Sequence, residues 1–493
     1  RRRPPAPPTP VEARALACAL SNSRASASAP PLRDAPVYRP TAAQFSDALG
    51  FIASIREEAA ACGGCKIVPP RGWREAAPPL DEALRFAPRL MALHSLGQGV
   101  GFQTAPRTSV RAFRESARRF KAEVRRTMGA EAGEEAGGGK RLREGEAEAE
   151  ERLFWRVVQT GCEPMVVSYG ADLDTRRHAS GFREGEAGQW NLNAMPSIPG
   201  SLLRHASEVP GVSSPWLYIG MLFSAFCWHT EDLWMYSCNH LHYGARKTWY
   251  CVPGSAAAQF ERATKRLLCT VFDQQPDLLY QMVAMFSLED LAAQGVPLYR
   301  IQQEEGEIVV SFPRAYHAGF SHGFNVAEAV NFAPPDWLPF GRQAVGCARR
   351  HRRPTVFCFT RLACDLARDA SVGREALEWL LPELGALVEE EISQRARFRR
   401  NGGSFQPVSG TEAHAEPRVC SHCKQWLYLS GVACGQPPKV ACLRHAVTLR
   451  AERPAAREGW YLHTDAELHE MVATAAKRLQ LLRKAAKEGS TRV

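Results

Sequence analysis

Length, composition and charge together describe a folded chain of several domains. The sequence has 493 residues, of which 45% are hydrophobic and 23% are charged, values typical of globular proteins with two to four domains. No apolar run reaches the roughly 18 residues of a membrane-spanning helix, so we expect no membrane partner. The net charge of +10 favours a polyanionic partner and allows non-specific contact with nucleic acid.

The cysteines indicate reduced thiols and a metal site. Fifteen are present, scattered singly through the first 364 positions and clustered only after Cys420. The sequence begins with RRRPPAPPTP and shows no apolar segment of the kind that a signal peptide carries. An odd number of cysteines without a secretory context argues against a disulfide framework.

The amino-acid composition of the N-terminal part changes at about residue 35. Residues 1–34 are rich in Pro, Ala, Ser and Arg, a composition that predicts disorder. A first small domain follows at 35–74, with a helix predicted from about Thr41 to Ala61 because apolar residues recur there at helical spacing. The C-x-x-C pair Cys62 and Cys65 has no partner pair nearby, so we expect it to pack structurally.

The next segments connect this domain to a larger one, predicted at 107–340. Residues 75–106 form a connector, and 107–126 have the pattern of a basic amphipathic helix. A charge-rich, low-complexity insertion at about 128–150 then predicts a mobile surface loop.

Short apolar segments with Gly and Pro turns follow. We expect alternating strands over 189–225, a helical stretch over 271–294 and strand again over 296–312. This pattern favours a mostly β catalytic core, a double-stranded β-helix or jelly roll whose open mouth can host a metal. Flanking helices, a helical region and linker at 341–410 and a small zinc finger at 411–475 complete the predicted fold, followed by a C-terminal helix or tail at 476–493.

The segment FCWHTEDLWMYSCNHLHYGARKTW carries the clearest chemical motif. His229 and Glu231 are two residues apart in a predicted strand, so both side chains point to the same face. Two other H-x-[DE] triplets begin at His414 and His463. The first triplet differs from them because His317, in another apolar segment, can complete a facial triad of two histidines and one carboxylate, the ligand set of non-haem Fe(II) oxygenases.

Lys247 lies eighteen positions after His229, between apolar neighbours. A lysine in such a strand requires a partner to be buried. Lys247 is therefore a candidate functional residue in addition to the triad.

The segment from Trp216 to Trp249, with YIGMLFSAFCWHTED and YGARKTWYCVPG, resembles the JmjC domain of histone lysine demethylases. The segments FPRAYHAGF and AEAVNF are similar to those of the JARID and plant branch of this family, which removes methyl groups from lysine 4 of histone H3. That branch also carries a JmjN segment, which 35–74 resembles, and a finger of five Cys, one His and two Cys.

The resemblance implies an Fe(II)- and 2-oxoglutarate-dependent dioxygenase that uses O2, hydroxylates N-methyl groups and releases formaldehyde. Its iron ligands fall on His229, Glu231 and His317, which are also the catalytic residues. Tyr218 matches the position beside the methylammonium group. The positions that bind 2-oxoglutarate fall on Tyr169, Phe226, Ser237, Asn239, Lys247 and Trp249. The histone H3 tail and chromatin are then the expected partners, and the nucleus the expected location.

Two positions depart from the family pattern. His240 stands where close relatives have tyrosine, and Ser321 stands where they often have asparagine. Neither change removes an iron ligand, but each can alter affinity for 2-oxoglutarate or selectivity among methyl states. The target lysine, the methyl state and the oligomeric state stay open at this point.

The C-terminal finger contains Cys420-x2-Cys423 and Cys442-x2-His445, a spacing typical of one tetrahedral structural Zn(II). The family finger carries two zincs. Here Cys434 remains from the second set while Gln436 stands where a cysteine would follow, so we expect the second zinc to be absent. Beyond it, Thr464 and Glu467 form a capping box that starts a helix.

Two other functions are compatible with the same domain. A JmjC protein hydroxylase would leave stable hydroxylation without formaldehyde, although simple hydroxylases lack JmjN and the finger. A catalytically silent chromatin scaffold would retain the fold, although the complete triad with Lys247 argues against it.

Overall fold

The computed structural model describes residues 32–74, 79–99, 101–132, 139–160, 165–408, 418–434, 439–449 and 458–490. They belong to two compact units. The first comprises the described residues up to Met195 together with Pro210–Glu231 and Tyr236–Asn331. The second comprises Pro196–Val209, Asp232–Met235 and the described residues from Phe332 onward. Among the described residues, none of the helices has the length and apolarity needed to cross a bilayer.

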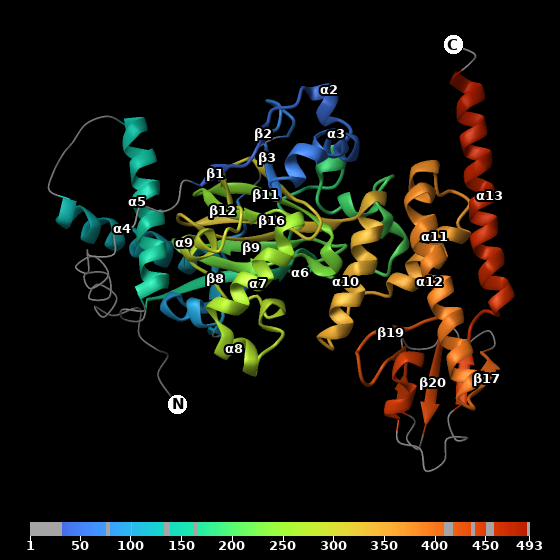
Figure 1. Cartoon of the computed structure of the whole chain (residues 1–493). Coiled ribbons are helices and arrows are strands. Elements are labelled where there is room, and N and C mark those ends of the chain that lie inside the picture. The colour runs from blue at the N-terminus through green and yellow to red at the C-terminus, as the bar shows by residue number, and fades with distance from the viewer. Residues whose placement is uncertain are drawn as a thin grey trace. The chain divides into compact units, whose positions relative to one another are not determined.

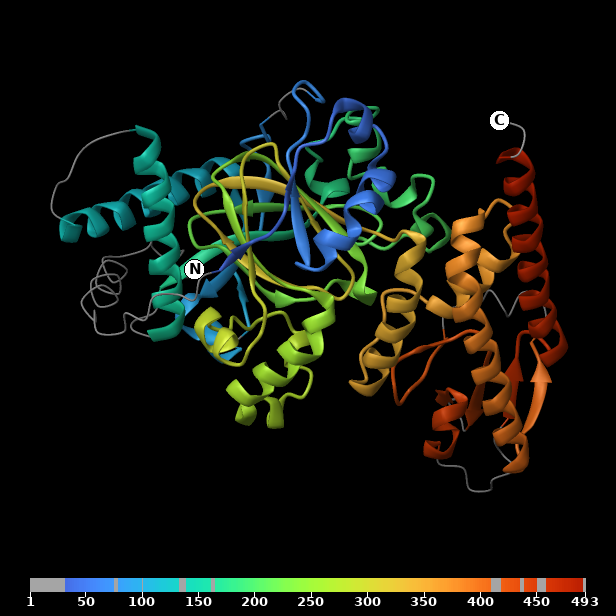
Figure 2. The same cartoon turned by 45° about the horizontal axis from the view of Figure 1, so that its top comes forward.

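Two β-sheets form the centre of the first unit, which confirms the predicted jelly-roll core (Figures 1 and 2). The five-stranded sheet has the order β1, β13, β12, β15 and β10, which span Arg33–Asp34, Tyr299–Gln303, Lys247–Val252, Tyr316–Ser321 and Ala225–His229. The nine-stranded sheet has the order β2, β3, β14, β11, β16, β9, β8, β5 and β6, which span Val37–Tyr38, Gly64–Ile67, Ile308–Ser311, Tyr236–Gly244, Asn325–Phe332, Trp216–Gly220, Val166–Asp174, Arg89–Ala92 and Gln103–Thr104. A separate two-stranded ribbon pairs β4 (Arg85–Phe86) with β7 (Thr108–Ser109).

The N-terminal segment contributes strands and helices to this unit. Arg33 and Asp34, predicted to be disordered, form β1 and pair with β13, whereas residues 1–31 lie outside the described residues. The predicted helix over 41–61 is divided into α2 (Ala42–Phe45) and α3 (Ala48–Ala60), because Asp47 caps a new helix by accepting from the Gly50 amide.

The Cys62 and Cys65 pair belongs to the protein core. Cys65 is fully buried on β3, and burial raises the pKa of its thiol. Neither cysteine belongs to a metal-ligand cluster among the described residues. Cys62 is partly buried and packs against the cluster that contains Cys251 and Ile301. A packing role for the pair stays a prediction.

The predicted mobile loop at about 128–150 is wrong for the residues that can be described. Helix α4 spans Val110–Ala132 and α5 spans Gly139–Thr160, and both lie beside the barrel strands (Figure 1). Glu150 and Glu151, the last acidic residues of the low-complexity segment, are buried. Charge composition predicted solvent exposure there, but these carboxylates have buried partners on the barrel.

Two other predicted segments differ from the structure because proline interrupts them. Residues 189–225 hold mainly short 3-10 turns, with strand only at β9 and the start of β10, since prolines recur through this stretch. The predicted helical stretch over 271–294 is divided around Pro276. Short helical elements of the first unit are α6 (Thr175–His178), α7 (Ala257–Leu267), α8 (Cys269–Gln274), α9 (Leu288–Ala293), η1 (Leu93–Gln98), η2 (Gly188–Trp190), η6 (Gly254–Ala256) and η7 (Leu278–Tyr280).

Four packed helices and a small sheet form most of the second unit. The predicted helical region is confirmed by η8 (Pro335–Trp337), α10 (Leu338–Arg350), α11 (Phe359–Arg368) and α12 (Arg374–Arg400). The four-stranded sheet has the order β17, β22, β20 and β21, which span Ser404–Pro407, Glu458–Tyr461, Ser430–Cys434 and Lys439–Ala441. The remaining elements are β18 (Arg418–Val419), β19 (Trp426–Leu427), η3 (Met195–Ser197), η4 (Leu202–His205), η5 (Asp232–Trp234), η10 (Leu443–Thr448) and α13 (Asp465–Ser490).

Two sequence predictions for this unit need correction. The polar linker expected at 401–410 contains β17, which pairs in parallel with β22. The boundary expected between 475 and 476 lies inside α13, which continues across it. The start of that helix is as predicted, since Thr464 and Glu467 exchange both capping-box hydrogen bonds.

Candidate active site

Strands β10 and β15 bring the predicted iron ligands together. They pair antiparallel, with His229 directly opposite His317, and Glu231 follows two residues after the first histidine. The ring centroids of the histidines lie 4.3 Å apart, and His317 Nε2 is 3.2 Å from Glu231 Oε1. One ligand atom from each residue lies within 4.8 Å of the others, so the three side chains can hold one metal ion.

Hydrogen bonds fix the orientation of these ligands. His229 Nδ1 lies 2.7 Å from the Cys227 carbonyl oxygen, which only an N–H can satisfy, and this leaves Nε2 unprotonated for a metal. The Asn331 amide donates to Glu231 Oε2 at 3.0 Å and to the Tyr236 carbonyl at 3.1 Å. The carboxylate is therefore held with its other oxygen directed at His317.

The electrostatics of the triad suit a divalent cation. Burial and the neighbouring His317 lower the pKa of His229 to about 4. Burial acts to raise the pKa of Glu231, but the hydrogen bond from His317 and the charges of both histidines lower it to about 2. At neutral pH, His229 is thus neutral and Glu231 ionised, the forms that coordinate a metal.

Lys247 projects into the barrel beside the triad. Its side chain is 1% exposed, and Nζ lies 5.5 to 6.0 Å from the ring centroids of Phe226, Tyr218, Tyr169 and Trp249. Within the described ranges, no acidic side chain pairs with it, and burial lowers its pKa to about 7. A buried lysine without a carboxylate partner is suited to bind an anionic ligand.

Gln303 links several of the predicted cosubstrate residues and was missed by sequence reasoning. It pairs with Lys247 across β13 and β12 and is fully buried. Its amide accepts from Trp249 Nε1 at 2.9 Å and donates to Asn239 Oδ1 at 3.2 Å. β13 reads YRIQQ and is followed by two glutamates, so no local pattern distinguished this glutamine. Ser237, the other predicted residue on β11, shares a 2.5 Å hydrogen bond with Ser311.

Tyr218 and Tyr169 lie on the adjacent strands β9 and β8, with ring centroids 6.1 Å apart. Asp172, also missed from the sequence, lies at a bulge in β8 with a φ of 57°, a conformation that costs energy and is common at functional sites. It forms an ion pair with Arg89, and its charge acts on the neighbouring Tyr218. Burial raises the pKa values of both tyrosines and of Asp172.

The two departures from the family pattern have different surroundings. Ser321 is paired with Lys247 across β15 and β12, so it lies at the site. His240 follows Asn239 on β11 and contacts Trp73, Phe182 and His242. Since neighbouring strand residues face opposite sides, His240 belongs to the outer packing of the barrel.

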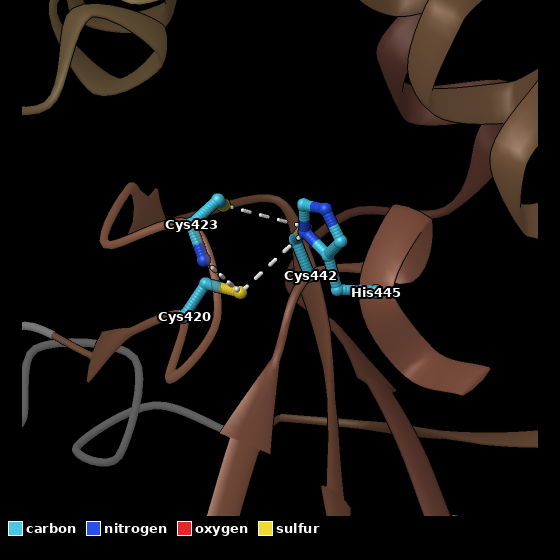
Figure 3. A group of neighbouring side chains, drawn as sticks. All are labelled: Cys420, Cys423, Cys442 and His445. Atoms are coloured by element: carbon cyan, nitrogen blue, oxygen red, sulfur yellow. Dashed lines mark hydrogen bonds between the residues drawn. The ribbon is translucent and has the colours of Figure 1, made fainter. Parts of the chain in front are cut away.

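The finger of the second unit brings its four predicted ligands together. Cys420, Cys423, Cys442 and His445 point toward a common centre (Figure 3), with ligand atoms within 4.8 Å of one another. Cys442 Sγ lies 3.1 Å from His445 Nδ1, and hydrogen bonds from the neighbouring thiols lower the pKa of Cys420. A Cys3His set in which one thiol ionises readily fits a closed zinc site. The side chain of Cys434, and all of Gln436, lie outside the described residues.

Comparison with protein families agrees with the geometry. Residues 216–332 match the JmjC domain, hydroxylase; residues 36–69 match the jmjN domain; and residues 420–471 match the C5HC2 zinc finger. The first unit therefore contains a JmjC domain of the hydroxylase class, and the triad of His229, Glu231 and His317 lies within it.

Curated relatives define the family more closely. The chain is 33% identical to lysine-specific demethylase JMJ703 of Oryza sativa subsp. japonica, over 86% of the chain and 40% of that protein. It is 40% identical to lysine-specific demethylase JMJ17 of Arabidopsis thaliana, over 66% of the chain and 29% of that protein. It is 41% identical to human lysine-specific demethylase 5D, over 60% of the chain and 20% of that protein.

The chain belongs to the family of JmjC proteins that combine JmjN, JmjC and a C5HC2 finger and that includes these lysine-specific demethylases. It spans less than half the length of each of the three relatives named.

Proposed function

We propose that this protein is an Fe(II)- and 2-oxoglutarate-dependent histone lysine demethylase that acts on methylated lysine 4 of histone H3 in the nucleus. The observation that carries the proposal is the facial triad of His229, Glu231 and His317 in the same barrel as the buried Lys247. The names of the relatives support demethylation of lysine. The similarity of FPRAYHAGF and AEAVNF to the lysine 4 branch supports the choice of target.

Iron held by the triad would supply the oxidative chemistry, in which 2-oxoglutarate is decarboxylated and an N-methyl group is hydroxylated and lost as formaldehyde. Lys247 binds the far carboxylate of 2-oxoglutarate as an ammonium ion, and Tyr169 supplies a hydroxyl beside it. Phe226 and Trp249, whose ring centroids are 4.5 Å apart, exclude water from this end of the pocket. Gln303 holds Trp249 and Asn239 in place through its amide.

Tyr218 and Asp172 form the part of the site that suits a methylated lysine. An aromatic ring stabilises a quaternary cation, and a carboxylate beside it adds favourable charge. No proton needs to leave the cationic nitrogen in this chemistry, so trimethylated lysine is a suitable substrate. The four ligands of the finger would hold one structural Zn(II).

Mass spectrometry of methylated H3 peptides tests the proposal. Peptides trimethylated at lysine 4, 9, 27 or 36 are incubated with the protein, Fe(II), ascorbate and 2-oxoglutarate, with His229→Ala as the control. We expect stepwise loss of methyl groups from the lysine 4 peptide and none with the control. Gain of one oxygen atom without methyl loss would indicate a protein hydroxylase. An unchanged set of peptides despite bound iron would indicate a scaffold.

A further inference from the structure

Strand β12 presents alternate side chains to two different surroundings. Lys247 and Trp249 face the interior of the barrel among aromatic rings. Thr248 and Tyr250 point to the opposite face, as strand geometry requires, and both are almost fully buried. Their contacts lead to the helix α5. The strand that carries the cosubstrate lysine is therefore held from behind by residues that the proposed mechanism does not use.

The first contact runs through a buried histidine. Thr248 Oγ1 lies 2.8 Å from His322 Nε2, and His322 Nδ1 lies 2.8 Å from Glu150 Oε2. The simplest assignment has Nδ1–H donate to the carboxylate while Nε2 accepts from the threonine hydroxyl. The other carboxylate oxygen of Glu150 is 3.1 Å from Lys121 Nζ on α4. A continuous polar chain thus connects α4 and α5 to the residue that follows Lys247.

The second contact is direct. The Tyr250 hydroxyl donates to Glu151 Oε1 at 2.6 Å and accepts from Trp155 Nε1 at 2.8 Å. Glu151 Oε2 lies 3.4 Å from a guanidinium nitrogen of Arg300 on β13. Two adjacent glutamates of α5 therefore hold two residues on the same face of β12.

Docking of α5 does not require these charges. Leu153, Phe154 and Val157 of the same helix are buried in the core, and the ring of Phe154 stacks on Phe320 at 4.2 Å. Apolar contacts of this kind are sufficient to attach a helix to a sheet, whereas burial of a carboxylate is costly unless it is fully paired. Hydrogen bonds are directional, so those that lead from the two glutamates to Thr248 and Tyr250 fix the position of β12 more precisely than apolar packing can.

We propose that Glu150 and Glu151 are positioning residues that hold β12 so that Lys247 and Trp249 meet the cosubstrate in the correct geometry. This inference rests on the proposed function, because it takes 2-oxoglutarate to be the ligand of Lys247. The end of the charge-rich insertion thus contributes to cosubstrate binding, although Glu150 and Glu151 lie on the face of β12 opposite to Lys247.

The test compares Glu150→Gln and Glu151→Gln with Glu148→Gln, a matched change at an exposed position of the same helix. Glutamine keeps the shape of each side chain and removes its charge. The KM for 2-oxoglutarate and kcat are measured separately, together with iron content and the visible absorption of the protein, Fe(II) and 2-oxoglutarate mixture. We expect KM to rise about tenfold in the two buried variants, as for loss of a hydrogen bond to a charged group. The iron content should stay unchanged, and the control should equal the wild type.

Tyr250→Phe tests the same contact from the strand. If Glu151 acts through this hydroxyl, the Tyr250→Phe and Glu151→Gln double variant should show no larger rise in KM than Glu151→Gln alone. Wild-type KM in both buried variants, or additive effects in the double variant, would overturn the inference. Failure of the wild-type protein itself to bind 2-oxoglutarate would instead overturn the proposed function, so the two failures are distinguishable.

Discussion

If Lys247 binds 2-oxoglutarate as proposed, that binding should depend on pH. Burial lowers its pKa to about 7, against about 10.4 in an unfolded chain. Between these two pKa values, Lys247 is protonated in the unfolded chain but neutral in the folded one, so the stability of the ligand-free protein rises with pH. Below about pH 7 the lysine is charged in both states, and the full free-energy cost of burying its charge then lowers the stability. An anionic ligand favours the ammonium form, so binding takes up a proton above that pH.

We therefore expect the affinity for 2-oxoglutarate to fall by up to about tenfold per pH unit above about pH 7. Calorimetric titration in buffers with different heats of ionisation measures both the affinity and the proton uptake. Lys247→Met should weaken binding and remove the pH dependence. Affinity that is constant up to about pH 9 would contradict the assignment.

Asn331 orients Glu231, the proposed acidic ligand of the metal. Its amide donates to Glu231 Oε2 and to the Tyr236 carbonyl, and loss of such outer hydrogen bonds typically weakens metal binding about 10- to 100-fold. Asn331→Ala should therefore lower the affinity for Fe(II) by about that factor, measured by metal titration under anaerobic conditions. Asn193→Ala, at an exposed position, serves as the control. Equal iron affinity in both variants would show that Glu231 keeps its orientation without the amide.

At the level of elements, the sequence predicted what periodicity and motif spacing control. The H-x-E motif correctly brought His229 and Glu231 together, although β10 ends at His229 and Glu231 lies just beyond the strand. The family pattern added His317 as the third ligand, but its pairing with His229 came only from the structure. Gln303 and Asp172 were not predicted, because their roles depend on strand pairing and on a bulge that no local pattern marks. The buried glutamates of α5 were hidden for the same reason, since their partners are distant in sequence.

Arg395 connects α12 to the elements around the finger. Its side chain is 1% exposed and donates to the His463 carbonyl at 2.6 Å, to Asp465 Oδ1 at 2.9 Å and to the Leu429 carbonyl at 3.0 Å. Arg395→Met leaves these acceptors without their donor and should reduce the free energy of unfolding of the second unit by about 3 kcal/mol. Thermal unfolding measures the loss. Arg399→Met, which removes a half-exposed partner of the same Asp465, should change it much less.

At the scale of the whole molecule, folding around the two candidate metal sites should depend on the metal to different degrees. The triad lies on paired strands inside a large core, so removal of iron should leave the first unit folded. The core around the finger ligands holds few buried residues, and two of these are the ligands Cys420 and Cys423 themselves. A core of this size gains most of its stability from a bound ion.

Metal analysis and circular dichroism of paired variants test this difference. Cys423→Ser should lose its zinc and the structure of the finger, whereas His229→Ala should lose iron and activity but keep the thermal transition of the wild type. We also expect one zinc per chain, because the second family site lacks a cysteine at Gln436. Two zincs per chain would show that other residues complete the second site. Retention of the finger fold in Cys423→Ser would show that its packing is sufficient without the metal.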